Sequence, residues 1–298
     1  MKTVRASAVL LAAAVVVAAA ACTGRGPGGP PGTVPRPGQT ALLEYRAAGG
    51  NCPPATPGCG AVEVVIGRDG AWRSSVGSER REGRLDAASL RLTTNLIEHG
   101  ADTLDGLPTA PPNLACPSSY DGQDVTITYH LRSRPVTVTN CDRQDPSRSK
   151  SLSWDNGLIV HTFTLAGYLS SGPRDYQPLI EWRASGGHCR EACPRQQVSV
   201  MADGRWTRVV DLEQTHGQLD PATTESLRAA VGSQFDSLAD LGPSTGCPSA
   251  YDGRDVLITY ADGRRIGTVA NCILDFGTNP LIDRTATVVA GILAEGGS

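Results

Sequence analysis

Alternating hydrophobic and polar positions predict β-strands at matching places in two halves of the chain. Period-two runs rich in Val, Ile, Tyr and Trp are typical of strands, and an Asp-Gly turn after each early pair favours a hairpin. Two further strands about a turn are predicted later in each half. In chain order the runs are ALLEYRAAGG (41–50), AVEVVIG (61–67), DVTITYHLRSRPVTVTNC (124–141), PLIEWRASGG (178–187), QVSVMA (197–202) and DVLITYADGRRIGTVANC (255–272).

Apolar residues at spacings of three and four predict a helix between the strand pairs of each half. In the first half this helix spans 85–100, and in the second it follows Asp220, an N-cap residue succeeded by proline. A terminal helix is predicted at 281–293, whereas its counterpart at 158–169 is rich in β-branched residues, which leaves the conformation of 150–170 open. The apolar faces are Leu85, Ala88, Leu92 and Leu96; Leu227, Val231 and Phe235; and Leu281, Thr285, Val288, Val289 and Ile292.

The two halves are copies of one unit. CPSSYDGQDVTITY (116–129) and CPSAYDGRDVLITY (247–260) are identical at eleven of fourteen positions, and flanking landmarks recur in the same order. We therefore predict an α+β protein with two tandem units, each an antiparallel sheet of about four strands with one or two helices packed on one face. The predicted segments are 1–22, a signal peptide ending in a lipidation cysteine; 23–40, a tether; 41–172, the first unit; and 173–298, the second unit.

The first forty residues differ from the two units in composition. Lys2 and Arg5 precede about sixteen mostly apolar residues, a run that is short for a transmembrane helix and typical of an export signal. Residues 23–40 are rich in Pro and Gly, which predicts an extended, solvated tether.

Small residues immediately before Cys22 resemble the lipobox of bacterial lipoproteins. The resemblance implies cleavage ahead of Cys22 and diacylation of its thiol, so that the protein is expected at the outer face of the bacterial cytoplasmic membrane, held by a lipid anchor. Plain secretion, with Cys22 as an unpaired thiol, is the alternative.

Eight cysteines follow Cys22, four in each unit, in a chain predicted to be exported. One cysteine loop has six intervening residues in the first copy and three in the second. A disulfide loop tolerates such a change, whereas both sulfurs of a zinc site must reach one ion. We predict disulfides, although four cysteines allow three pairings per unit. The predicted pairs are Cys52 with Cys59, Cys116 with Cys141, Cys189 with Cys193, and Cys247 with Cys272.

Motifs for catalysis are missing from the sequence. It contains no G-x-S-x-G, no H-E-x-x-H and no Gly-rich phosphate loop. Its five histidines do not recur at matched positions, which favours solvated over catalytic side chains. A net charge of −3 without a basic stripe argues against nucleic acid as a partner. We therefore predict that the protein is not an enzyme and holds no metal or other cofactor.

Two short resemblances favour a protein-binding function. CPSSYDG and CPSAYDG, each with a closing NC, resemble the subtilisin-inhibitor family, in which a cysteine-bridged loop enters a serine protease. The order Y/W-R-A-x-G-G, strand, helix, Y-D-G-x-D-V-x-I-T-Y, strand, helix resembles emfourin-type inhibitors of metalloproteases. The alternative is that Cys-Pro-x-x-Tyr-Asp-Gly only shapes a buried turn. The candidate binding residues are Ser118, Ser119 and Tyr120 in the first copy and Ser249, Ala250 and Tyr251 in the second.

The function that these observations predict is a membrane-anchored extracytoplasmic protein-binding module. Its most specific form is a two-headed protease inhibitor, whose partner is an extracytoplasmic protease. The main alternative is a structural or envelope-maintenance lipoprotein with no discrete ligand. A solute-binding protein or an enzyme is the third hypothesis, and it lacks a repeated catalytic constellation.

Overall fold

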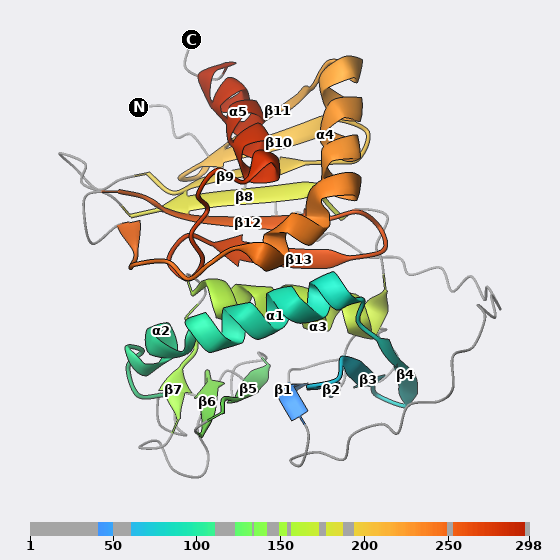
Figure 1. Cartoon of the computed structure of the whole chain (residues 1–298), viewed down its shortest axis with the longest axis vertical. Coiled ribbons are helices and arrows are strands. Elements are labelled where there is room, and N and C mark those ends of the chain that lie inside the picture. The colour runs from blue at the N-terminus through green and yellow to red at the C-terminus, as the bar shows by residue number, and fades with distance from the viewer. Residues whose placement is uncertain are drawn as a thin grey trace, which may run out of the picture.

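The computed structural model of the chain contains two β-sheets with helices packed on them (Figure 1). It describes residues 41–49, 61–110, 123–132, 134–141, 149–153, 156–172, 177–186, 194–248 and 253–295. The first unit comprises β1 (Ala41–Ala48), β2 (Val62–Gly67), β3 (Ala71–Val76), β4 (Glu79–Arg84), α1 (Ala87–His99), α2 (Ala101–Asp105), β5 (Asp124–His130), β6 (Pro135–Thr139), β7 (Lys150–Ser151) and α3 (Gly157–Ser171). The second unit comprises β8 (Ile180–Ser185), β9 (Gln196–Val200), β10 (Arg205–Val210), β11 (Glu213–Gln218), α4 (Pro221–Gln234), the 3₁₀ helix η3 (Phe235–Asp240), β12 (Asp255–Ala261), β13 (Ile266–Ala270) and α5 (Pro280–Glu295).

The sheets have the same strand order in both units. The first runs β4-β3-β2-β1-β5-β6-β7 and the second β11-β10-β9-β8-β12-β13. Neighbouring strands are antiparallel except β7, a short strand that pairs in parallel with β6. The chain is therefore α+β, and its elements recur in one order, with β7 added in the first unit.

The sheets are larger than the four strands predicted from the sequence. The additional strands are chiefly β3 and β4 in the first unit and β10 and β11 in the second. Every residue of β4, which reads ERREGR, is exposed. Because β4 has no buried face, its sequence shows no alternation of hydrophobic and polar residues. Charged side chains on an edge strand oppose pairing with another chain. The sequence pattern missed β4 and β11 because it records burial, and these two edge strands have little.

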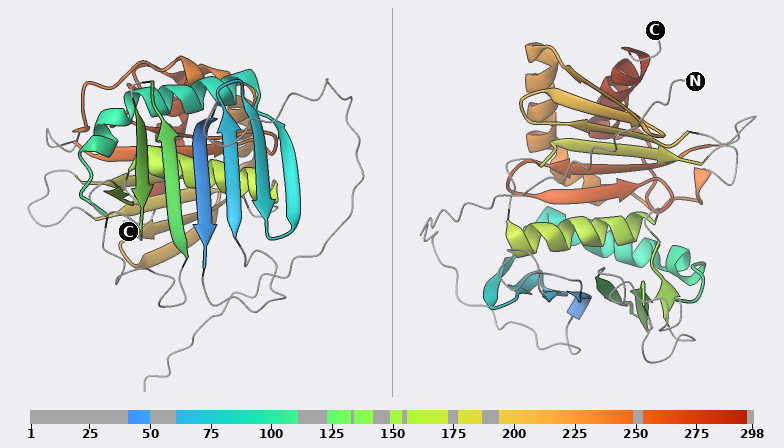
Figure 2. Two further views of the ribbon diagram at one scale, coloured as in Figure 1. Left: turned by 90° about the horizontal axis from the view of Figure 1, so that it is seen from below. Right: turned by 180° about the vertical axis from the view of Figure 1, so that it is seen from behind.

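Two long helices cover one face of each sheet, α1 and α3 in the first unit and α4 and α5 in the second (Figures 1 and 2). Each helix start is capped by a side chain. Asp86 accepts hydrogen bonds from two backbone N–H groups of α1, and Asp220, the predicted N-cap, accepts one from Thr223 at 2.9 Å. Asn156 and Asn279 cap α3 and α5 in the same way.

A buried hydrogen bond fixes the last helix of each unit to an inner strand of its sheet, β5 or β12. The Tyr129 hydroxyl lies 3.0 Å from Thr162 Oγ1 on α3, and the Tyr260 hydroxyl donates to Thr285 Oγ1 on α5 at 3.1 Å. Both tyrosines are fully buried. The tyrosine at the end of each DV-x-ITY motif therefore makes the same contact with the last helix in both units.

The segment whose conformation the sequence left open, 150–170, forms β7 and most of α3. The helix is buried on nearly every side, including the β-branched residues Ile159, Val160 and Thr162. A helix that is apolar all round is typical of burial between two layers. One side of α3 packs on its own sheet, and β13 of the second unit runs along its other side (Figure 1).

The two units meet where β13, the edge strand of the second sheet, lies against α1 and α3 of the first (Figure 1). Close approach depends on Gly157 at the start of α3 and on Gly267 in β13. A Cβ atom at Gly267 would lie 2.7 Å from Leu92 Cδ2 of α1, and one at Gly157 would collide with Ala270 Cβ. Buried side chains of both units consequently form one continuous core.

Polar contacts join the units around this core. Asn95 Nδ2 donates to the Ala239 carbonyl at 2.8 Å, and Arg91 forms an ion pair with Asp240 at 3.5 Å. Both contacts connect α1 to η3. Covering β13 in this way also removes a free sheet edge, which would otherwise offer unpaired backbone groups.

The outer faces of the two helix pairs differ in polarity. Leu92 is 1% exposed on α1, whereas the same helical position on α4 is Ser226, which is half-buried. On α5 the exposed Arg284 stands where α3 has the buried His161, and the side chain of Arg284 donates a hydrogen bond to Ser226. The apolar outer face thus belongs to the first unit, where the second unit covers it.

Candidate functional site

A cleft of about 1100 Å³ opens between the two units, beside the turn that joins β12 to β13. We call it the interunit cleft. Both units supply its apolar side chains, which come from two strands, one helix and the segments that flank them. These are Trp72, Leu85, Leu165, Leu169, Leu179 and Ile266.

Charged side chains of both signs surround this apolar lining. Arg84, which forms an ion pair with Asp69 at 3.2 Å, comes from β4 of the first unit. Arg228, which pairs with Glu225 at 3.1 Å, comes from α4, and the exposed Arg264 comes from the β12–β13 turn. Because carboxylates also line the cleft, its charge is mixed rather than uniformly basic.

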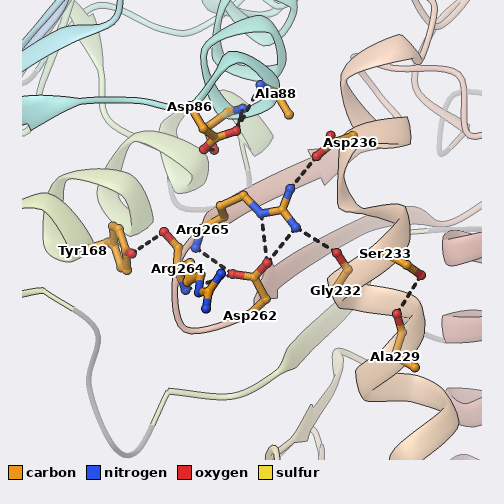
Figure 3. A network of polar contacts seen from close by, with 11 residues as sticks. Asp86, Ala88, Tyr168, Ala229, Gly232, Ser233, Asp236, Asp262, Arg264 and Arg265 are labelled. Carbon is orange, nitrogen blue, oxygen red and sulfur yellow. Dashed lines mark hydrogen bonds and ion pairs between the residues drawn. The ribbon is translucent and has the colours of Figure 1, made fainter. Parts of the chain in front are cut away.

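Arg265 is the centre of a polar network on one wall of the cleft (Figure 3). Its guanidinium pairs with Asp262 at 2.8 Å and with Asp236, and it donates to the Gly232 carbonyl at 3.0 Å. It also lies 4.5 Å above the Phe235 ring. Burial acts to lower the pKa of Arg265, but the hydrogen bond and charge of Asp262 outweigh it and raise the pKa overall. The network thus holds the turn against α4 and η3.

Tyr168 of α3 connects the first unit to this wall. Its hydroxyl donates to the Arg264 carbonyl at 2.5 Å (Figure 3). Burial, with a smaller effect from the Asp262 carboxylate, raises the pKa of Tyr168, so its phenol stays protonated at neutral pH. Opposite, Asp86 caps α1 and accepts a 2.6 Å hydrogen bond from Ser89 Oγ. Side chains from three helices and a turn therefore fix the shape of the cleft.

The charged and hydroxyl side chains of the described lining are mostly paired with one another. Among the described residues that line the cleft there is no histidine or cysteine. Asp86, Asp236 and Asp262 are engaged in a helix cap or in ion pairs with arginine, and Ser89 donates to a carboxylate instead of facing a base. The described lining therefore has no nucleophile paired with a base, which is the arrangement that activates a hydroxyl group.

A smaller pocket of about 360 Å³ lies on the first unit alone, near the β5–β6 turn. His130 Nε2 is 3.0 Å from Glu44 Oε1, and both side chains are mostly buried. Arg132 and Glu98 form an ion pair at 2.8 Å on its rim. The equivalent place in the second unit has Ala261 in place of His130, so this pair does not recur.

The structure contains the predicted disulfide between Cys247 and Cys272, which ties the segment before β12 to the end of β13. Cys141 is also disulfide-bonded. The remaining predicted site residues lie outside the described residues. They are Cys22, Cys52, Cys59, Cys116, Cys189, Cys193, Ser118, Ser119, Tyr120, Ser249, Ala250 and Tyr251.

One group of potential metal ligands occurs among the described residues: Cys247, Asp255 and Cys272. The two sulfurs are bonded to each other, so neither is available as a thiolate. The group is therefore part of the disulfide and not a metal site.

The cleft adjoins the end of β12 and the turn that follows it. Residues 249–251, the predicted binding loop of the second unit, come before that strand in the sequence and lie outside the described residues. Sequence reasoning missed the cleft because its walls come from different units. A repeat pattern describes each unit separately and carries no signal for their contact.

Within the described part of the chain, no helix combines the length and the apolar character that crossing a membrane requires. No protein-family model matches the chain, and no curated protein matches its sequence.

Proposed function

We propose that the protein is a lipid-anchored extracytoplasmic module that binds a segment of another polypeptide in the interunit cleft. The observation that carries this proposal is the preformed cleft itself, whose walls are held by contacts from both units. Cys22 is its lipid anchor, and residues 23–40 hold the folded units away from the membrane surface.

The lining favours a polypeptide over other ligand classes. Its volume of about 1100 Å³ exceeds the usual 300–1000 Å³ of small-molecule pockets. The apolar side chains of the lining suit alternate side chains of an extended segment, while the exposed Arg264 can pair with its acidic groups. Carboxylates in the lining and a net charge of −3 oppose nucleic acid.

Filling the cleft should abolish this binding. Ala87 is exposed at the start of α1 and lines the cleft, so Ala87→Trp places a large ring there without disturbing the core. Peptides selected from a random heptapeptide library on the wild-type protein should bind Ala87→Trp at least about tenfold more weakly, equivalent to about 1.4 kcal/mol. Fluorescence anisotropy with labelled peptides measures the change.

A matched control is Ala222→Trp, in the first turn of α4. Ala222 is also exposed but is not among the residues that line the cleft, so this variant should bind the selected peptides as the wild type does. Equal binding by Ala87→Trp and wild type, or failure to select any peptide, would contradict the proposal. The second of these results would favour a structural lipoprotein without a discrete ligand.

Protease inhibition is a second candidate function, supported by the Cys247–Cys272 disulfide. A covalent tie at the base of residues 249–251 lowers the entropy lost when such a loop binds a partner. Ser118 and Ser249 are small, whereas a protease specificity pocket is filled better by a larger side chain.

Ser118→Met with Ser249→Met should therefore create or strengthen inhibition of a subtilisin-like or chymotrypsin-like protease. Titration of purified residues 41–298 against serine proteases measures it, with metalloproteases in the same panel. Ser78→Met, at an exposed turn, is the control. A well-folded double variant that inhibits nothing would exclude this function.

A further inference from the structure

His161 lies at the contact between the two units, 2% exposed, on the side of α3 that meets β13. Both of its ring nitrogens make hydrogen bonds. Nε2 lies 3.0 Å from Thr93 Oγ1 of α1, and Nδ1 accepts from the Thr268 backbone N–H of β13 at 3.2 Å. One imidazole thus joins two helices of the first unit to the edge strand of the second.

The partners fix the protonation state of this ring. The Thr93 hydroxyl donates to the Ser89 carbonyl at 2.8 Å, so it accepts from His161 Nε2–H. The Thr268 N–H can only donate, so Nδ1 carries no proton. The ring is therefore neutral with its proton on Nε2.

We propose that the His161 contact between the units is acid-sensitive. When Nδ1 takes up a proton, this contact breaks and β13 separates from α1 and α3. A proton on Nδ1 would face the Thr268 N–H, donor against donor, and the contact would be lost. The Thr268 N–H would then lose its acceptor at a covered sheet edge, where an unpaired donor is unfavourable.

The surroundings offer no compensation for a positive charge. The groups that contact the ring, from α1 and β13, are neutral, and Thr268 is in turn bonded to Thr259 of β12 at 2.8 Å. Burial alone lowers the pKa of His161 to about 4, with no contribution from a charged group on any element packed against it. Relative to the ordinary value of 6.5, the closed form binds this proton roughly 300-fold more weakly.

The pH range of the effect follows from these values. A form in which the units have separated exposes His161, whose pKa then returns toward 6.5. Above pH 6.5 both forms are deprotonated and the closed form has its full stability. As the pH falls from 6.5 toward 4, the separated form gains a proton that the closed form does not, so the closed form is progressively disfavoured.

Small-angle X-ray scattering of the chain from residue 23 onward, between pH 7.5 and 3.5, tests whether the two units separate in acid. The radius of gyration should rise with a midpoint between pH 4 and 6.5, while far-UV circular dichroism on the same samples keeps its sheet and helix signal. Histidine ring NMR signals, recorded on the wild type, should show one ring that titrates with this midpoint and well below 6.5.

His161→Gln is the decisive variant because an amide can accept from Thr268 and donate to Thr93 without titrating. It should stay compact to a pH at least one unit lower than the wild type does. His130→Gln removes a histidine that is bonded to Glu44, away from the contact, and should keep the wild-type profile.

The proposal is overturned if the wild type stays compact at pH 3.5, or if wild type and His161→Gln expand at the same pH. It is also overturned if circular dichroism is lost with the expansion, or if every histidine ring titrates near 6.5. None of these measurements involves a ligand, so the proposal stands or falls independently of peptide binding in the cleft.

Discussion

Replacing Cys247 and Cys272 together with alanine is expected to lower the free energy of unfolding by about 3 kcal/mol, because their disulfide closes a loop with a sequence separation of 25. The loop contains all of β12 and β13, and β13 is the strand that meets α1 and α3 of the first unit. For a folded region of this size the melting temperature should fall by about 6–12 °C, measured by differential scanning calorimetry.

The control for this experiment is chemical reduction. The double variant should lose less melting temperature on reduction than the wild type, since one of its disulfides is already absent. An unchanged melting temperature in the double variant would show that the folded state does not depend on this link. Equal drops on reduction in the wild type and the double variant would assign the stability to the other cysteines.

Leu92→Ser should also lower the stability of the protein strongly. Leu92 is 1% exposed between α1 and β13, and the substitution removes a buried side chain and places a hydroxyl in an apolar contact. We expect the free energy of unfolding to fall by about 3–5 kcal/mol, with the loss concentrated where the units meet. Chemical denaturation gives the free energy, and hydrogen exchange should show reduced protection in α1, α3 and β13.

The reverse change, Ser226→Leu, is the matched control. It puts leucine at the same helical position on α4, which β13 does not cover. Since the site is half-exposed, the free energy of unfolding should change by less than about 0.5 kcal/mol. Similar losses in both variants would contradict the view that only the first unit has a covered outer helix face.

The sequence predicted the parts of the fold that local pattern determines. Asp220 caps α4 as expected, Ala88, Leu92 and Leu96 are buried along α1, and the strands of the DV-x-ITY segments pair as hairpins. The cap and the hairpins depend on contacts within one unit, whereas the apolar face of α1 that carries Leu92 meets β13 of the other unit. Apolar spacing predicts that a helix face is buried, but not which unit covers it.

Features of the first unit that depend on its contact with β13 of the second unit were not predicted. α3 is apolar on both sides because β13 covers its outer side, so its pattern resembled a strand as much as a helix. His161 was expected to be solvated with the other histidines, and it is buried because the same strand covers it. The interunit cleft arises from that contact too, and no residue spacing within one unit records it.

The unequal polarity of the two helix pairs also affects whether their outer faces can accept another edge strand. Docking an edge strand of one unit onto the helices of another is a head-to-tail contact, and such a contact propagates into an open filament unless one end is blocked. Ser226, Asp283 and Arg284 place polar groups on the outer side of α4 and α5, where the first unit has Leu92, Val160 and His161. Another edge strand docking on α4 and α5 would therefore have to bury these polar groups, which β13 does not have to do on α1 and α3.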